Sequence, residues 1–166
     1  MRFLPVDELK SLRGEHCHLD HTVIEGELQP LPRSIKGDSI EIVAEFNLKD
    51  CRAEEFGFKM RVSDDGNEET VLSYSPKTGE LQFDRNRSDG WSQGIRKCKL
   101  ESADKDTLRS HIYIDTCVVE VFADEGRTIM TNNIYPNPYS INLKLFSLGD
   151  KVELISLDIW QLRSVG

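Results

Sequence analysis

The chain has 166 residues, of which 38% are hydrophobic and 30% are charged, which is the composition of one soluble globular domain. Its formal net charge of −8 repels phosphate groups, so nucleic acids and anionic membrane surfaces are excluded as partners. No apolar run approaches the about 20 residues that span a membrane, and the apolar run at the N-terminus is too short for a signal peptide. We therefore expect a cytoplasmic protein, or a piece of a larger protein whose targeting signal lies elsewhere.

The first element that the sequence predicts is a short helix over residues 5–14. Pro5 and two acidic residues occupy its first turn, Leu9 and Leu12 lie three residues apart, and Gly14 ends it. A helix of little over two turns is marginal in isolation, so it must dock on other elements. We expect residues 1–20 to form a linker helix and a connecting loop, and residues 21–166 to form a single β-sandwich domain.

After the helix, apolar and polar residues alternate, which is typical of antiparallel strands with one buried face. The alternation predicts strands over 40–48, 56–62, 70–74, 81–83, 108–114, 141–145 and 155–159. It places Glu41 and Arg61 on the solvent side of their strands. Near the C-terminus Val152, Leu154 and Trp160 are predicted to form a second face, outside the core. Glycine-containing turns separate the strands, so the sequence predicts an all-β, two-sheet antiparallel β-sandwich with a short N-terminal helix.

Three imidazoles and a thiol lie within six residues, at His16, Cys17, His18 and His21, and these side chains are candidate zinc ligands. Their spacing is cramped, and no matching pair follows downstream, so we interpret the segment as a polar loop and expect no metal or other cofactor. The cysteines form no Cys-x-x-Cys pair, and we expect four reduced, mostly buried thiols.

Two carboxylates about 5–10 Å apart would be needed for glycoside hydrolysis. Asp84, Asp115 and Glu120 lie on or beside apolar strands, but a capping or ion-pairing role is favoured because Arg85 and Arg87 follow closely. The chain has no Gly-x-Ser-x-Gly elbow, no P-loop and no dinucleotide-binding glycine motif. The sequence therefore predicts no catalytic residue.

Aromatic residues in polar loops are candidates for carbohydrate binding, because a sugar ring packs its apolar face on an exposed aromatic ring. Trp91 lies in a turn-rich polar stretch, and Tyr135 and Tyr139 flank the loop Pro136-Asn137-Pro138. Trp91 and Tyr135 are the candidate carbohydrate-binding residues. The alternative for each is that it only plugs an edge of the sandwich.

The strand segments, taken in order, resemble the C-terminal β-sandwich of glycoside hydrolase family 32, the family of invertases, levanases and sucrose-6-phosphate hydrolases. The best-matching stretch is 108–126, with Val119-Glu120-Val121-Phe122 at its centre, followed by Thr131 and Ile134-Tyr135-Pro136. Upstream, Phe56-Gly57-Phe58 and residues 84–88 fall in matching order. The sequence departs from the family at Thr116-Cys117 and over 16–21. The resemblance implies a jelly roll of the concanavalin A type.

In that family a five-bladed β-propeller precedes the sandwich and carries the aspartate nucleophile, an Arg-Asp-Pro motif and a Glu-Cys acid/base. None of these motifs occurs in this chain. The resemblance therefore implies a non-catalytic module of a bacterial β-fructosidase-type enzyme. The implied partner of this module is the missing N-terminal propeller, and in some members of the family the module also helps form oligomers. The alternatives are a free-standing, lectin-like module that binds a fructoside or another glycan, and a small hydrolase in its own right.

Overall fold

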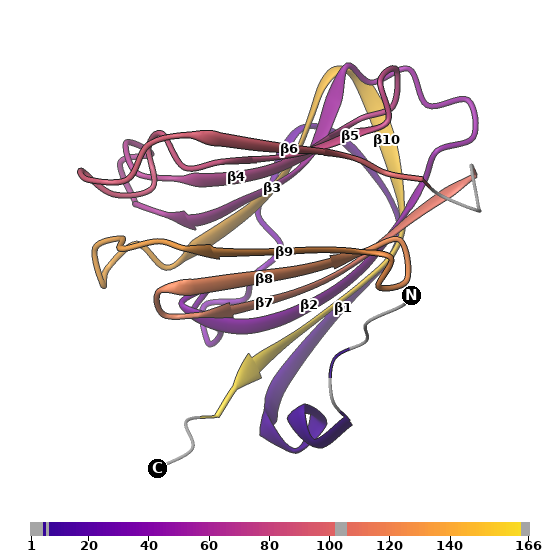
Figure 1. Cartoon of the computed structure of the whole chain (residues 1–166). Coiled ribbons are helices and arrows are strands. Elements are labelled where there is room, and N and C mark those ends of the chain that lie inside the picture. Colours follow the sequence, from indigo (N-terminus) through magenta and orange to yellow (C-terminus); the bar gives the residue numbers. More distant parts are fainter. Residues whose placement is uncertain (1–4, 6, 102–105, 164–166) are drawn as a thin grey trace.

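The structure is a computed structural model that describes residues 5, 7–101 and 106–163. A short 3-10 helix, η1, is followed by ten strands in the described ranges (Figure 1). The elements are η1 (Asp7–Leu12), β1 (Arg13–Leu28), β2 (Ser39–Asn47), β3 (Glu55–Val62), β4 (Thr70–Ser75), β5 (Glu80–Asp84), β6 (Ile95–Lys99), β7 (Thr107–Asp115), β8 (Val118–Ala123), β9 (Thr128–Asn133) and β10 (Asn142–Leu162).

All strand pairs are antiparallel, in the order β6-β5-β4-β3-β10-β2-β7-β8-β9, and β1 also pairs with β10. The 21-residue β10 pairs with β3 through its first part and with β2 through its last part. The sheet therefore folds over along β1 and β10. Figure 1 shows the result as two layers, an upper one with β3 to β6 and a lower one with β2 and β7 to β9. The expected antiparallel β-sandwich is confirmed.

The core lies between the two layers and contains the apolar residues that the alternation predicts. Ile40, Ile42 and Phe46 from β2 and Phe56 and Phe58 from β3 are at most 2% exposed. The ring of Phe46 packs against both phenylalanines of β3, with centroids 4.7 and 5.8 Å apart. These contacts join strands from opposite layers. They stabilise the sandwich because large aromatic side chains contribute most of the apolar area that such a core buries.

The predicted short N-terminal helix is confirmed, as a 3-10 helix of six residues with no buried residue in it. The expected connecting loop is instead a strand, because β1 begins at Arg13. In β1 Cys17 and Leu19 pack on the core opposite Ile159 and Leu157, while the alternating His16 and His18 point outward. This alternation has the period of a strand, but a thiol and imidazoles do not mark it as clearly as aliphatic residues do.

The prediction that Val152 and Leu154 lie on a non-core face was also wrong, since both are at most 2% exposed in the core. The register between β10 and β2 shifts between Leu154 and Ser156. A bulge of this kind changes which side of the strand faces inward. Leu157 and Ile159 consequently continue the core, whereas Trp160 is half-buried on the outer face of the lower layer.

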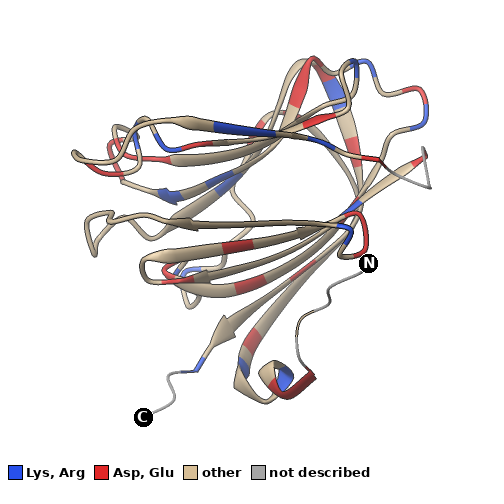
Figure 2. Cartoon of the chain, in the orientation of Figure 1, with Lys and Arg blue, Asp and Glu red and all other residues tan. Residues whose placement is uncertain are grey.

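Charges of both signs are interspersed over the two layers and their connecting loops (Figure 2). No helix in the described part of the chain is long and apolar enough to cross a membrane.

Candidate functional site

A groove of about 840 Å³ lies at one end of the sandwich, where three loops meet. The loops are the β3–β4 turn, the β5–β6 loop and the β9–β10 loop, so the groove joins segments from both layers. Its lining residues are Ser63, Asp64, Asp65, Asn67, Glu68, Asn86, Arg87, Asp89, Gly90, Tyr135, Asn137, Tyr139 and Ser140. A floor of carboxylates, amides and hydroxyls beside aromatic rings is the composition of a site for a polar, ring-shaped ligand.

Asp89 connects the two loops that carry the candidate aromatic residues. Its Oδ1 accepts the backbone N–H of Trp91 at 2.8 Å and that of Ser92, and its Oδ2 accepts the backbone N–H of Tyr135 at 2.9 Å. Burial works to raise the pKa of Asp89, but these N–H donors outweigh burial, and the pKa lies below its usual range. The sequence marked Asp89 only as a turn residue, because its partner loop lies 46 positions away.

The structure brings Trp91 and Tyr135 onto adjacent loops but gives them different positions. Tyr135 lines the groove and is 59% exposed, as is its neighbour Tyr139 at 84%. Trp91 is 89% exposed and lies on the β5–β6 loop without lining the groove. Neither Trp91 nor Tyr135 plugs an edge of the core. Their role in binding carbohydrate stays a prediction.

Arg61 supports the groove from below, and sequence reasoning missed it. Instead of facing solvent, Arg61 is 2% exposed with a positive φ of 49°, at an irregular part of the pairing between β3 and β10. Its guanidinium donates to the carbonyl oxygens of Ser140 at 2.7 Å, Asn137 at 3.2 Å and Thr116. One buried cation therefore holds the β9–β10 loop and the β7–β8 turn in place.

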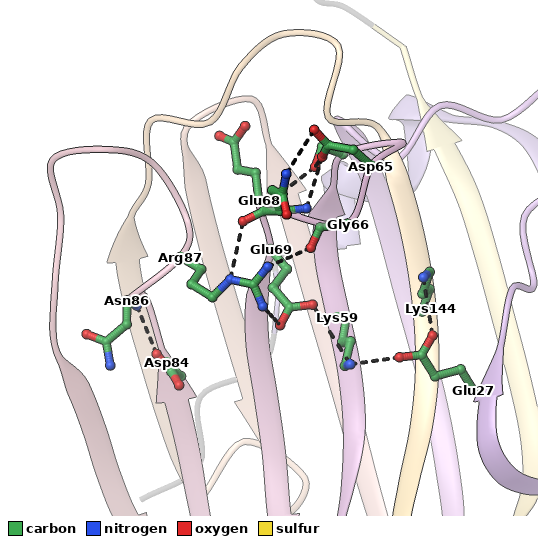
Figure 3. A network of polar contacts seen from close by, with 12 residues as sticks. Glu27, Lys59, Asp65, Gly66, Glu68, Glu69, Asp84, Asn86, Arg87 and Lys144 are labelled. Atoms are coloured by element: carbon green, nitrogen blue, oxygen red, sulfur yellow. Dashed lines mark hydrogen bonds and ion pairs between the residues drawn. The ribbon is translucent and has the colours of Figure 1, made fainter.

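An ion-pair ladder runs from the groove across the outer face of the upper layer (Figure 3). Arg87 Nη1 lies 3.3 Å from Glu69 and its Nη2 donates to the carbonyl oxygen of Gly66 at 2.7 Å. Lys59 lies 3.9 Å from Glu69 and 2.8 Å from Glu27. Lys144 also pairs with Glu27, at 3.2 Å. These partly exposed pairs link neighbouring strands and fix the β3–β4 turn beside the groove.

The outer face of the lower layer has a different character, because a carboxylate is buried there. Glu41 is 0% exposed, although the sequence predicts it on the solvent side. Arg13 Nε and Nη2 donate to its two oxygens at 2.8 and 2.7 Å, His111 Nε2 lies 2.7 Å from Oε1, and the Tyr113 hydroxyl donates to Oε1 at 3.1 Å. Burial works to raise the pKa of Glu41, but these hydrogen bonds outweigh burial and lower it to about 2.

Beside this buried carboxylate the outer face has a hollow of about 430 Å³. Val43 and Phe122 contribute apolar and aromatic walls, His111, Arg109 and Glu125 contribute polar ones, and Pro5, near the start of the described chain, also lines it. The chain therefore reaches the sandwich on the outer face of the lower layer. The lower layer presents a hollow with apolar walls and a polar rim, whereas the upper layer presents an ion-pair ladder.

The remaining predicted residues are not brought together as one cluster. Cys17 points to the core, away from His16 and His18, and His21 lies 3.4 Å from Glu153. The contacts of His18 with Asp158 and Asp20 raise the pKa of its imidazole. Asp84 has the structural role that was favoured for it, because its Oδ1 accepts the backbone N–H of Asn86 at 2.8 Å. All four cysteines are free, but each is half-buried, so the prediction that they are mostly buried was wrong.

Comparison with solved structures supports the same fold. An exo-inulinase from Aspergillus awamori superposes with a TM-score of 0.79 and 21% identity, over 94% of this chain and 31% of that one. The fructan 1-exohydrolase IIa of Cichorium intybus gives a TM-score of 0.80 with 17% identity, over 97% of this chain and 38% of that one. At these identities the likeness concerns the fold.

Sequence comparison identifies the family. A levanase from Bacillus subtilis is 30% identical over 97% of this chain and 24% of its own length, and a sucrose-6-phosphate hydrolase from Zymomonas mobilis is 26% identical over 96% and 31%. The chain thus spans about a quarter to a third of the length of these two relatives. The profile described as "Glycosyl hydrolases family 32 C terminal" matches residues 8–161. The chain therefore belongs to the family of C-terminal domains of family 32 glycosyl hydrolases.

Proposed function

We propose that this chain is the non-catalytic C-terminal module of a β-fructosidase-type glycosidase that hydrolyses sucrose, sucrose 6-phosphate or fructans. The observation that carries the proposal is the match of residues 8–161 to a C-terminal domain, together with the small share of each relative that the chain covers. The absence from the sequence of Asn-Asp-Pro-Asn, Arg-Asp-Pro and Glu-Cys supports a role without catalytic residues. The free cysteines support a reducing, cytoplasmic location.

The partner in this proposal is an N-terminal β-propeller, and its docking surface is the outer face of the lower layer. Three features support this face: the hollow between Val43, His111 and Phe122, the position of Pro5 beside it, and the buried Glu41. Apolar surface that is rimmed by polar residues is typical of an interface. Packing there stabilises both domains by removing apolar area from water.

Two experiments test this proposal. The gene upstream of Met1 is expected to encode, in frame, a propeller with an Asn-Asp-Pro-Asn motif, and a stop codon directly before Met1 would contradict it. The purified chain is expected not to release fructose from sucrose, sucrose 6-phosphate, inulin or levan, and measurable hydrolysis would favour a small hydrolase instead.

The docking surface is tested in the full-length enzyme by Val43→Asp, with Val71→Asp as the matched control. Both valines are half-buried, but Val71 lies on β4 in the other layer. Only Val43→Asp is expected to lower the melting temperature of the full-length enzyme by more than that of the 166-residue chain. Equal effects of the two substitutions would show that the propeller does not cover this face.

A second candidate function, carbohydrate binding, is favoured by the groove and by the attachment of both aromatic loops to Asp89. Sugar rings would pack on Tyr135 and Tyr139, and the polar floor would contact their hydroxyl groups. Calorimetric titration with sucrose, inulin and levan oligomers tests it. Binding that Tyr135→Ala and Tyr139→Ala weaken, and that Leu148→Ala at an exposed position of β10 leaves unchanged, would support this function. No heat with any of these sugars would exclude them as ligands.

A further inference from the structure

Two histidines of β1 and an aspartate of β10 form a compact cluster on the outer side of the sheet. His16 and His18 are two residues apart on one strand, so their imidazoles point to the same side. Directly across the ladder, His16 pairs with Trp160 and His18 pairs with Asp158. Antiparallel pairing thus brings together groups that are separated by about 140 positions along the chain.

The ligand atoms of this cluster converge on one point. His16 Nε2 lies 2.8 Å and His18 Nδ1 lies 2.6 Å from the same Oδ1 atom of Asp158. One ligand atom from each of the three residues lies within 4.8 Å of the others. In a tetrahedral zinc site with bonds of about 2.1 Å, ligand atoms are about 3.4 Å apart. The separations of 2.8 and 2.6 Å from Asp158 Oδ1 are hydrogen-bond distances, so these partly exposed side chains must move apart to admit an ion.

The hydrogen-bond pattern of His18 requires its imidazole to be either doubly protonated or bound to a metal ion. Its Nε2 lies 2.8 Å from Asp20 Oδ1, and its Nδ1 faces Asp158. A carboxylate oxygen accepts but does not donate, and a neutral imidazole has only one N–H. Both contacts are satisfied together only when Nδ1 carries a second proton or binds a metal ion. With Asp20 accepting from Nε2–H, the lone pair of Nδ1 is directed at the cluster, which is how outer-sphere carboxylates orient metal-bound histidines.

We propose that His16 Nε2, His18 Nδ1 and the Asp158 carboxylate bind a divalent transition-metal ion such as Zn²⁺, and that Asp20 orients His18. Two imidazoles and one carboxylate select zinc-type ions over Mg²⁺ and Ca²⁺, which prefer ligand sets made only of oxygen. All three side chains are partly exposed, with exposed fractions of 42%, 41% and 27%, so the ion enters from solvent and water completes its coordination. Cys17 takes no part, because it packs on the core.

Trp160 provides a built-in reporter for this site. Its indole stacks on the His16 ring with centroids 4.8 Å apart and an interplanar angle of 13°. A paramagnetic ion on His16 is expected to quench the fluorescence of Trp160. Because the sequence contains two tryptophans, a Trp91→Phe background makes Trp160 the only emitter. Cu²⁺ serves as the quenching probe, and diamagnetic Zn²⁺ competes with it.

The test is calorimetric titration of the tag-free 166-residue chain with ZnCl₂, repeated with MgCl₂. We expect one Zn²⁺ per chain with micromolar affinity, no heat with Mg²⁺, and reversal of the Cu²⁺ quenching by Zn²⁺. His18→Gln and Asp158→Asn are expected to abolish binding, and Asp20→Asn to weaken it about tenfold or more. His21→Gln is the matched control, since it removes an exposed imidazole of the same strand from outside the cluster.

Three results would overturn the proposal: no saturable Zn²⁺ binding by the wild-type chain at millimolar metal, equal losses in His21→Gln and His18→Gln, or quenching that persists in His16→Gln. Circular dichroism and a melting curve for each variant check that the exposed substitutions leave the fold intact. The experiment needs no catalytic domain, so its outcome is separate from that of the proposed function.

Discussion

Replacing Glu41 with Gln removes a carboxylate that is fully buried among Arg13, His111 and Tyr113. The pKa of Glu41 falls from the usual 4.5 to about 2. At about 1.4 kcal/mol for each pH unit, this difference corresponds to about 3 kcal/mol of folding free energy at neutral pH. That value agrees with the about 3–5 kcal/mol by which removal of one partner destabilises a buried ion pair.

The sign of the pH dependence follows from the lowered pKa. A carboxyl group whose pKa is lower in the folded state contributes its full stability above the unfolded-state pKa, here 4.5, and loses it as the pH falls to about 2. Urea unfolding of wild type and Glu41→Gln between pH 7 and pH 2.5 measures this contribution. The two curves are expected to differ by about 3 kcal/mol at pH 7 and to converge toward pH 2.5.

Glu45→Gln is the matched control, because Glu45 lies on the same strand and face but pairs with Arg109 at 3.3 Å with partial exposure. An exposed pair of this kind contributes at most about 1 kcal/mol. Equal losses in the two variants would refute the reasoning. So would a Glu41→Gln loss that stays constant from pH 7 to pH 2.5, because packing rather than charge would then be responsible.

Three further substitutions test other parts of the structure by urea unfolding. Arg61→Met leaves three carbonyl oxygens near the groove without their cationic donor, and a loss of about 3 kcal/mol or more is expected; a loss below about 1 kcal/mol would contradict that role. Asp89→Asn removes a charged acceptor of three N–H groups and is expected to cost about 2 kcal/mol and to change Trp91 fluorescence; unaltered emission would contradict the attachment of the two loops. Gly57→Ala places a Cβ 2.0 Å from a backbone oxygen of β4 and is expected to cost more than Gly66→Ala, where the space is open; equal costs would contradict the close approach.

The sequence by itself determined the class of fold and most of the core. Residues such as Ile40, Ile42, Phe56 and Phe58 are inside because strand period and apolar character coincide, and both are local properties of a segment. The family was suggested by the resemblance of residues 108–126 and their neighbours, and the jelly roll was what that resemblance implied. The positions of the turns could also be predicted from the sequence, because glycine and aspartate have local backbone preferences that favour turns.

Only the tertiary structure decided which polar side chains are buried and which distant loops meet. Glu41 and Arg61 have ordinary solvent-side positions in the sequence. The burial of Glu41 is made favourable by the donors of Arg13 and of β7, and that of Arg61 by carbonyl acceptors in two loops. The bulge beyond Leu154 and the contacts of Asp89 likewise depend on partners across the sheet. Burial of a polar group depends on the partners that satisfy it, and those partners are set by strand pairing between segments far apart in the chain.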